Sequence, residues 1–116
     1  MHKSFILFLL LNFLVFHLGI SQVESIDISR GNHYFEKGYY FDAIKHYNYA
    51  LRRKKTLQLL ERVSDCHLKL KNYKEAERFF EEANKKFKLN ASQKLKYAYL
   101  LKVNRRFKAA ELILSS

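Results

Sequence analysis

The sequence predicts an all-α fold of tandem antiparallel helix pairs, and three observations lead to this prediction. First, small residues recur at spacings of 33 and 34 residues, as Ala43, Ala76 and Ala110 show. Second, the 116 residues include no proline and only three glycines, so the turn residues typical of β-rich folds are missing. Third, 48% of the residues are hydrophobic, which is enough to build a packed core. A repeat of this length indicates stacked units rather than one closed core.

Five columns of residues keep this register along the chain. They divide it into units of about 24–56, 57–90 and 91–116, of which the last is truncated. We therefore expect a single domain, 22–116, with two and a half to three repeats. The columns are Gly31, Ser64 and Ala98; Tyr34, His67 and Leu101; Tyr40, Tyr73 and Phe107; Ala43, Ala76 and Ala110; and Tyr47, Phe80 and Leu114.

Residues 1–21 look like a secretory signal peptide. A lysine near the start is followed by an apolar run, 5–16, and cleavage is expected after Ser21. The alternative is an uncleaved inner-membrane anchor through 5–20, which is close to the lower limit of about 17 residues for crossing a bilayer. The polar Asn12 within the run disfavours the anchor, because polar groups cost energy in hydrocarbon. We therefore expect an exported protein of the periplasm or outer membrane.

The first unit illustrates how each helix pair is predicted. Residues 25–37 form the first helix, and Gly38 stands where a helix end needs a residue that adopts positive φ without strain. Residues 40–54 form the second helix, whose apolar side chains recur at helical spacing and share one face. Four of these side chains are expected in the core: Phe41, Ile44, Tyr47 and Leu51.

The later turns and caps follow from the same register. Asn72 and Asn104 fall within one position of Gly38 in the repeat, and asparagine is the next best residue at a left-handed helix end. Thr56 and Asn90 precede the first helices of the next two units and are predicted N-caps. Asn90 also begins an Asn-Ala-Ser glycosylation acceptor, but the cap is the favoured interpretation.

This pattern resembles the tetratricopeptide repeat family from about Glu24 to the end of the chain. The five columns carry the resemblance, together with further alanines at Ala50 and Ala83. The resemblance implies a short right-handed solenoid whose first helices line a concave face. Each unit departs from the family where a large residue is usual early in the first helix and where a proline usually ends the unit. The departures are Asp27, Leu60, Lys94, Lys55 and Lys88.

More narrowly, a secretory signal followed directly by these repeats is similar to the N-terminal repeat region of certain Gram-negative envelope proteins. Those proteins carry a propeller and an OmpA-like domain after the repeats, and some belong to gliding and type IX secretion machinery. The resemblance covers the repeat region alone, so peptidoglycan binding is not carried over to this chain.

The resemblance places the outward positions of each first helix on the concave face, as a candidate groove for an extended or helical peptide. Family members that grip C-terminal carboxylates use lysine and asparagine there. Only Asn32 matches that arrangement, and Ile28 stands where a lysine is expected, so that activity is not carried over. The candidate groove residues are Ile28, Asn32, Phe35, Glu61, Asp65, Leu68, Leu95, Tyr99 and Lys102.

The chain is strongly basic, with 22 Lys and Arg against 11 Asp and Glu and a formal charge of +11. Two clusters recur at the end of the second helix of a unit, where positive charge complements the helix dipole. A solvated edge is the first interpretation of this basic stripe, and contact with an anionic envelope surface or acidic partner is the second. Nucleic acid is disfavoured, because an exported protein rarely meets it. The basic stripe comprises Arg52, Arg53, Lys54, Lys55, Lys85, Lys86 and Lys88.

No catalytic, metal or cofactor motif is found in the sequence. The chain has no Gly-rich phosphate loop, and its histidines lack the i, i+4 spacing of a helical zinc site. Cys66 is expected to be a small buried residue, and His67 a packed residue of the core or groove. We therefore expect a non-catalytic protein that needs no cofactor.

Two functions remain open from the sequence. The first is a protein–protein interaction module or scaffold of the bacterial envelope that binds a peptide or protein in the groove. The second is a structural piece, complete or part of a longer protein, that docks or self-associates through its last helix. That helix carries Leu112 and Leu114 with no polar cap after it.

Overall fold

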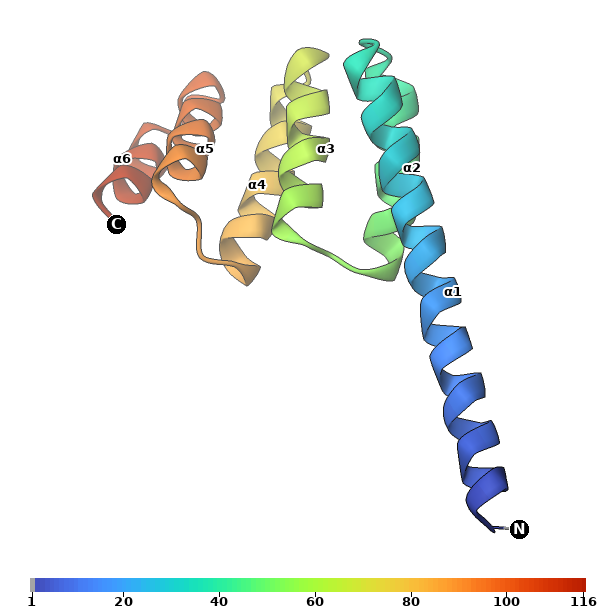
Figure 1. Ribbon diagram of the computed structural model, residues 1–116. Helices are drawn as coiled ribbons and strands as arrows, with labels where there is room; N and C mark the ends of the chain where they lie inside the picture. Colours follow the sequence, from blue (N-terminus) through green and yellow to red (C-terminus); the bar gives the residue numbers. More distant parts are fainter. Residues whose placement is uncertain (1) are drawn as a thin grey trace.

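The computed structural model describes residues 2–116, except that the side chains of residues 18–25 lie outside the described part. The described residues form only helices and no strand, as predicted (Figure 1). The helices are α1 (His2–Glu36), α2 (Tyr40–Arg53), α3 (Leu57–Lys69), α4 (Tyr73–Lys86), α5 (Ala91–Val103) and α6 (Phe107–Ser115).

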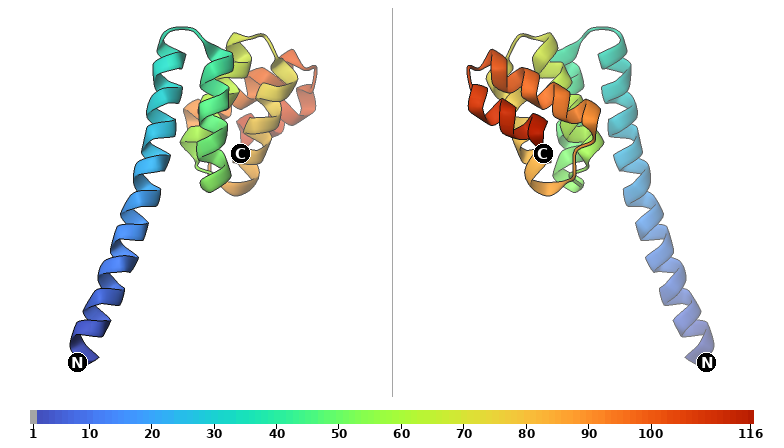
Figure 2. Two further views of the ribbon diagram at one scale, coloured as in Figure 1. Left: turned by 90° about the vertical axis from the view of Figure 1, so that its right-hand side faces the viewer. Right: turned by 90° about the vertical axis from the view of Figure 1, so that its left-hand side faces the viewer.

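Successive helices lie side by side as the antiparallel pairs α1–α2, α3–α4 and α5–α6, and each pair also contacts the next (Figures 1 and 2). The contact between pairs runs from the second helix of one pair to the first helix of the next. This arrangement agrees with the predicted helical repeat and its two-helix unit.

The first helix is much longer than the predicted 25–37, since α1 begins at His2. No proline interrupts the sequence before residue 36, so the apolar N-terminal segment continues directly into the first helix of the repeat. Its N-terminal half projects away from the helix pairs, and residues 5–11 and 13–16 are exposed (Figure 2). In the part of the chain that is described, no helix combines the length and apolar character needed to cross a membrane. The expected cleavage site after Ser21 lies within residues 18–25, whose side chains are outside the described part of the structure.

All three first helices end in the same left-handed turn. The residues with positive φ are Gly38 (79°), Lys71 (59°) and Arg105 (62°), which share one repeat position. Each donates its N–H to the carbonyl three residues back, and the next residue donates to the carbonyl five residues back, over 2.7–3.0 Å. This is a Schellman motif, and it satisfies carbonyls that the helix end leaves open. The prediction that Asn72 and Asn104 take this conformation is wrong, because the repeat register places the turn one residue earlier or later.

The predicted N-caps are confirmed. Thr56 Oγ1 accepts the N–H of Leu59 over 3.2 Å. Asn90 Oδ1 accepts the N–H of Gln93 over 2.8 Å, and Gln93 Oε1 accepts the N–H of Asn90 over 2.9 Å, which makes a complete capping box. These bonds fix where α3 and α5 begin.

The core follows the columns of small residues. Ala43, Ala76 and Ala110 are fully buried on the second helices, where each faces the first helix of its own pair. The hydroxyl of Ser64 donates to the carbonyl of Ala76 over 2.8 Å, so the small polar residue is satisfied inside the core. Of the four side chains predicted for the core of α2, Phe41 is instead 76% exposed, because it lies on the outer side of the first turn.

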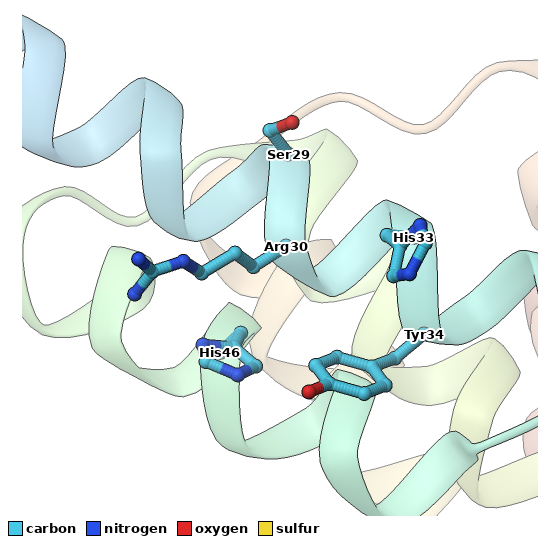
Figure 3. Close-up of a pocket in the computed structure, with 5 residues that line it drawn as sticks. All are labelled: Ser29, Arg30, His33, Tyr34 and His46. Carbon is cyan, nitrogen blue, oxygen red and sulfur yellow. The ribbon is translucent and has the colours of Figure 1, made fainter.

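A stacked ring pair also repeats with the units. Tyr34 on α1 stacks on His46 of α2, with ring centroids 5.3 Å apart and planes 4° from parallel (Figure 3). His67 on α3 stacks on Phe79 of α4 in the equivalent positions, with centroids 5.5 Å apart. The histidine of the stack lies on the second helix in the first unit and on the first helix in the second unit, but both units contain the stacked pair.

Candidate functional site

An apolar hollow of about 270 Å³ lies between α3, α4 and α5. It includes four of the predicted groove residues, namely Asp65, Leu68, Leu95 and Tyr99. Sequence reasoning did not assign the other lining residues to the groove. Those residues are Ser64, Phe80, Lys96 and Leu100.

The hollow has a buried floor and an exposed apolar rim. Phe80 and Leu100 are each only 1% exposed, whereas Leu95 is 62% exposed and Tyr99 is 52% exposed. Leu95 and Tyr99 lie one turn apart on α5 and therefore stand on the same side of it. An apolar side chain that entered the hollow would cover both of them.

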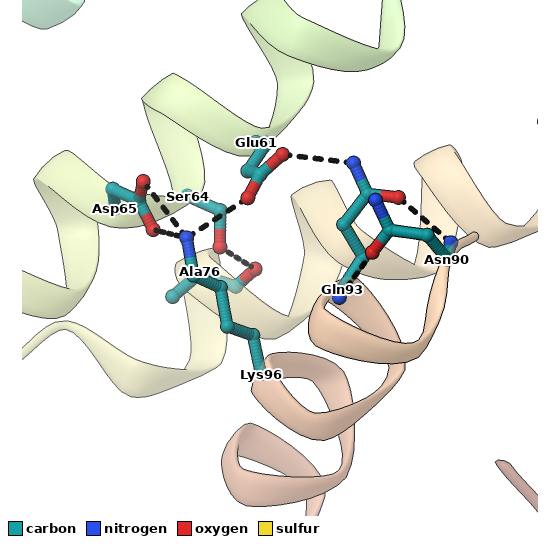
Figure 4. A network of polar contacts seen from close by, with 7 residues as sticks. All are labelled: Glu61, Ser64, Asp65, Ala76, Asn90, Gln93 and Lys96. Carbon is teal, nitrogen blue, oxygen red and sulfur yellow. Dashed lines mark hydrogen bonds and ion pairs between the residues drawn. The ribbon is translucent and has the colours of Figure 1, made fainter. Parts of the chain in front are cut away.

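A polar wall closes one side of the hollow (Figure 4). Lys96 Nζ of α5 donates to Glu61 Oε1 over 2.8 Å and lies 3.4 Å from both carboxylate oxygens of Asp65 on α3. Gln93 Nε2 also donates to Glu61, over 3.0 Å. These bonds join the second and third pairs across the groove. The same residues continue into an adjoining polar hollow of about 290 Å³, lined by Gln58, Glu61, Arg62, Asp65 and Lys96.

The two carboxylates of this wall differ in their electrostatics. Burial alone would raise the pKa of Glu61, but the hydrogen bonds from Lys96 and Gln93 outweigh it and lower the pKa. Burial raises the pKa of Asp65, and the charge of Lys96 only partly opposes this. For Lys96, burial lowers the pKa, but the hydrogen bonds and charges of Glu61 and Asp65 together outweigh burial and raise the pKa. The hydrogen-bond partners of Glu61 therefore favour its ionised form, whereas burial makes the ionised form of Asp65 less favourable.

The remaining groove residues do not line the apolar hollow. Asn32 Oδ1 accepts the hydroxyl of Tyr47 over 2.6 Å, and Ile28 is packed against the core. The ring of Phe35 lies edge-on to the ring of Tyr40. The guanidinium carbon of Arg62 lies over the Phe35 ring, 4.7 Å from the centroid of that ring. In the first pair these positions therefore contribute chiefly to packing. Lys102 is exposed at the end of α5, and Glu61 stands in the adjoining polar hollow.

Most cations of the basic stripe are engaged by carboxylates. Arg53 pairs with Asp27, and Lys55 pairs with Glu82 of the next unit. Lys85 lies 3.3 Å from Glu81, and Lys86 lies 3.6 Å from Glu82. Arg52 lies over the ring of Tyr49. Among the described residues, Lys54 and Lys88 have neither an ion pair nor a ring contact, so the stripe offers a polyanion much less unpaired charge than the sequence suggests.

No nucleophile or metal cluster is apparent in the described residues. Cys66 is fully buried, and burial raises the pKa of its thiol to about 12, so the thiolate is not populated at neutral pH. The described part of the chain holds no group of three or more His, Cys, Asp or Glu side chains placed to bind a metal ion.

A comparison of the sequence with models of known protein families finds no match, and a comparison with curated proteins finds no relative. The function of the chain is therefore inferred from its own residues.

Proposed function

We propose that this chain is a solenoid of the tetratricopeptide kind that binds a peptide segment of another protein, without catalysis. The repeat columns, the shared turns and the pair-to-pair contacts support the solenoid. The observation that carries the binding function is the apolar hollow, with its buried Phe80 floor and its exposed Leu95 and Tyr99 rim.

The hollow suits one apolar side chain of an extended or helical peptide. Exposed aromatic and aliphatic residues around a preformed apolar hollow are typical anchors of peptide recognition. The polar wall beside it offers Asp65 as an acceptor for a peptide N–H or a basic side chain. Because α3, α4 and α5 are already packed, little ordering entropy opposes binding.

A second candidate function is docking through α6. Leu112 is 70% exposed and Leu114 is 45% exposed, whereas the column equivalents of Leu114, Tyr47 and Phe80, are buried. In the second unit, Phe80 is covered by Tyr97 of the following helix, and their ring centroids lie 6.0 Å apart. A helix from a neighbouring protein would cover Leu114 in the same way.

Peptides that bind the full chain can be selected from a random displayed library. Their affinities for variants of the chain then distinguish the groove from α6 as the binding surface. Tyr99→Ala should weaken the selected peptides by at least about tenfold, because a truncated anchor typically costs 2 kcal/mol or more, about 30-fold. Leu112→Ala is the control, since it truncates another exposed apolar side chain, on α6. If Leu112→Ala abolishes binding and Tyr99→Ala does not, α6 is the docking surface. If neither changes affinity, the groove proposal is wrong.

We also infer export from the N-terminal segment. The expected product is a mature chain that begins at Gln22, after cleavage that follows Ser21. Intact mass of the protein isolated from its native host tests this inference. A mass that retains residues 1–21 would contradict the inference.

A further inference from the structure

A second hollow, of about 400 Å³, opens on the free face of the first helix pair (Figure 3). It shares no residue with the peptide groove, and none of the described residues that line it is acidic. The lining residues are Ser29, Arg30, His33 and Tyr34 from α1 and His46 from α2.

The repeat register shows what this face would otherwise do. Arg30 and His33 correspond to Val63 and Cys66 of the second unit, which are fully buried where α3 packs on the preceding pair. In the first unit the described residues place no helix against this face, and its apolar positions are replaced by cationic and ionisable ones. A polar end keeps a solenoid soluble, but that role requires no particular charge.

This hollow differs from most of the basic stripe, whose cations are engaged by carboxylates. Elsewhere Arg53 pairs with Asp27, and Lys55 pairs with Glu82. Arg30, by contrast, has no ion pair among the described residues, and its side chain extends from α1 to one side of His46 (Figure 3). An arginine that lines a hollow without a carboxylate leaves its planar fork of donors available to a ligand.

The stack of Tyr34 on His46 adds two further polar groups to the lining of the hollow. The Tyr34 hydroxyl points towards the side of the hollow where Arg30 and His46 lie, whereas the hydroxyl of Ser29 points away (Figure 3). Nδ1 of His46 is buried and has no hydrogen-bond partner in the described structure. An unsatisfied buried N–H costs more than an unsatisfied lone pair, which favours the tautomer of His46 that carries its proton on Nε2. The Arg30, Nε2 and Tyr34 groups are therefore all hydrogen-bond donors.

We propose that this hollow binds a phosphate or sulfate group. The ionised oxygens of such an oxyanion are hydrogen-bond acceptors, which matches a lining that offers donors, and the arginine fork can hold two of these oxygens at once. A metal cation is the wrong ligand, because Arg30 would repel it. The proposal does not depend on the groove function, since the two hollows lie on different pairs.

Titration of the full chain with sodium sulfate and with sodium phosphate tests the proposal. Ionic strength is held constant with sodium chloride, and the ring signals of His33 and His46 are followed by NMR. Saturable shifts of the His46 signals are expected with both salts. Arg30→Gln should weaken binding at least about tenfold, because it removes the charge-assisted bonds. Tyr34→Phe keeps the ring stack, removes one donor and should weaken binding to a smaller degree.

Lys108→Gln is the matched control, since it removes one exposed positive charge from α6 and should change affinity less than about twofold. Vesicles of phosphatidylcholine with and without phosphatidic acid then distinguish a lipid headgroup from a free oxyanion. An Arg30-dependent response in either the salt or the vesicle arm supports the site. The proposal is overturned if no shift saturates, or if Arg30→Gln and Lys108→Gln weaken binding equally.

Discussion

Gly31 is the position at which the first helix pair leaves the least room, so Gly31→Ala gives a sharp test of the packing. A Cβ at this position would lie 2.5 Å from both Cδ1 and Cε1 of Tyr47 and 3.0 Å from its Cζ. Ordinary carbon contacts are about 3.5–4.0 Å. Tyr47 is fully buried, and its hydroxyl is bound to Asn32, so the ring cannot simply swing away.

The expected cost is the difference between two effects. Overpacking a well-filled core by one methyl group typically costs about 1–3 kcal/mol. Replacing glycine by alanine within a helix contributes about 0.5–1 kcal/mol in the opposite direction, because alanine loses less backbone entropy. The clash is the larger effect, and we expect Gly31→Ala to lower the free energy of unfolding by about 1–2 kcal/mol.

Urea unfolding followed by circular dichroism measures this loss, with the m-value expected to stay unchanged. The Tyr47→Leu background is the control, because a smaller side chain removes the atoms that the new methyl group meets. In that background Gly31→Ala should be neutral or stabilising, which gives a clear coupling free energy in the double-mutant cycle. The reasoning is refuted if Gly31→Ala is as stable as the wild type when Tyr47 is present.

Two further predictions concern a cap and a buried histidine. Asn90→Ala should lower the free energy of unfolding by about 1 kcal/mol, since it removes the side-chain acceptor of the capping box, whereas Asn90→Asp should retain most of the stability in the same urea assay. Burial lowers the pKa of His67, so the unfolded chain binds a proton more readily, and stability should fall as pH drops through about 6.5 towards the folded-state pKa. His67→Leu, which copies Leu101 of the third unit, should reduce the loss in urea midpoint between pH 8 and pH 5; an unchanged loss would contradict the assignment.

The repeat register predicted much of the fold residue by residue. A period of 33 and 34 residues carried the buried alanines and the caps at Thr56 and Asn90 to their correct places. The two later turns were misplaced because the propensity of asparagine was preferred over the register, which leads from Gly38 to Lys71 and Arg105. For a residue other than glycine, such as Lys71 or Arg105, the left-handed conformation costs about 1–2 kcal/mol. The turn offsets this cost because its hydrogen bonds satisfy the carbonyls of the helix end.

The candidate site was less accessible from the sequence. Periodicity indicates which positions of a helix share a face, and the resemblance to a repeat family implied one groove for Leu68, Leu95 and Tyr99. Periodicity does not indicate which side chains meet between units. The bridge from Lys96 to Glu61 joins residues 35 positions apart, and only the relative placement of α3 and α5 brings them together.

The size of the small residue on the first helix of a pair is related to the size of the residue in the Tyr47 column on the second helix. In the first unit the smallest residue, Gly31, faces the large ring of Tyr47, and the methyl group of an alanine would already clash. The second unit combines Ser64 with the ring of Phe80, and the third combines Ala98 with the smaller Leu114. Because glycine accompanies the bulkiest partner and alanine the least bulky, the volume shared by the two columns is kept more closely than the identity of either residue. In the first pair the close approach of the helices is therefore a property of matched residues, and a substitution at Gly31 is best interpreted together with its partner Tyr47.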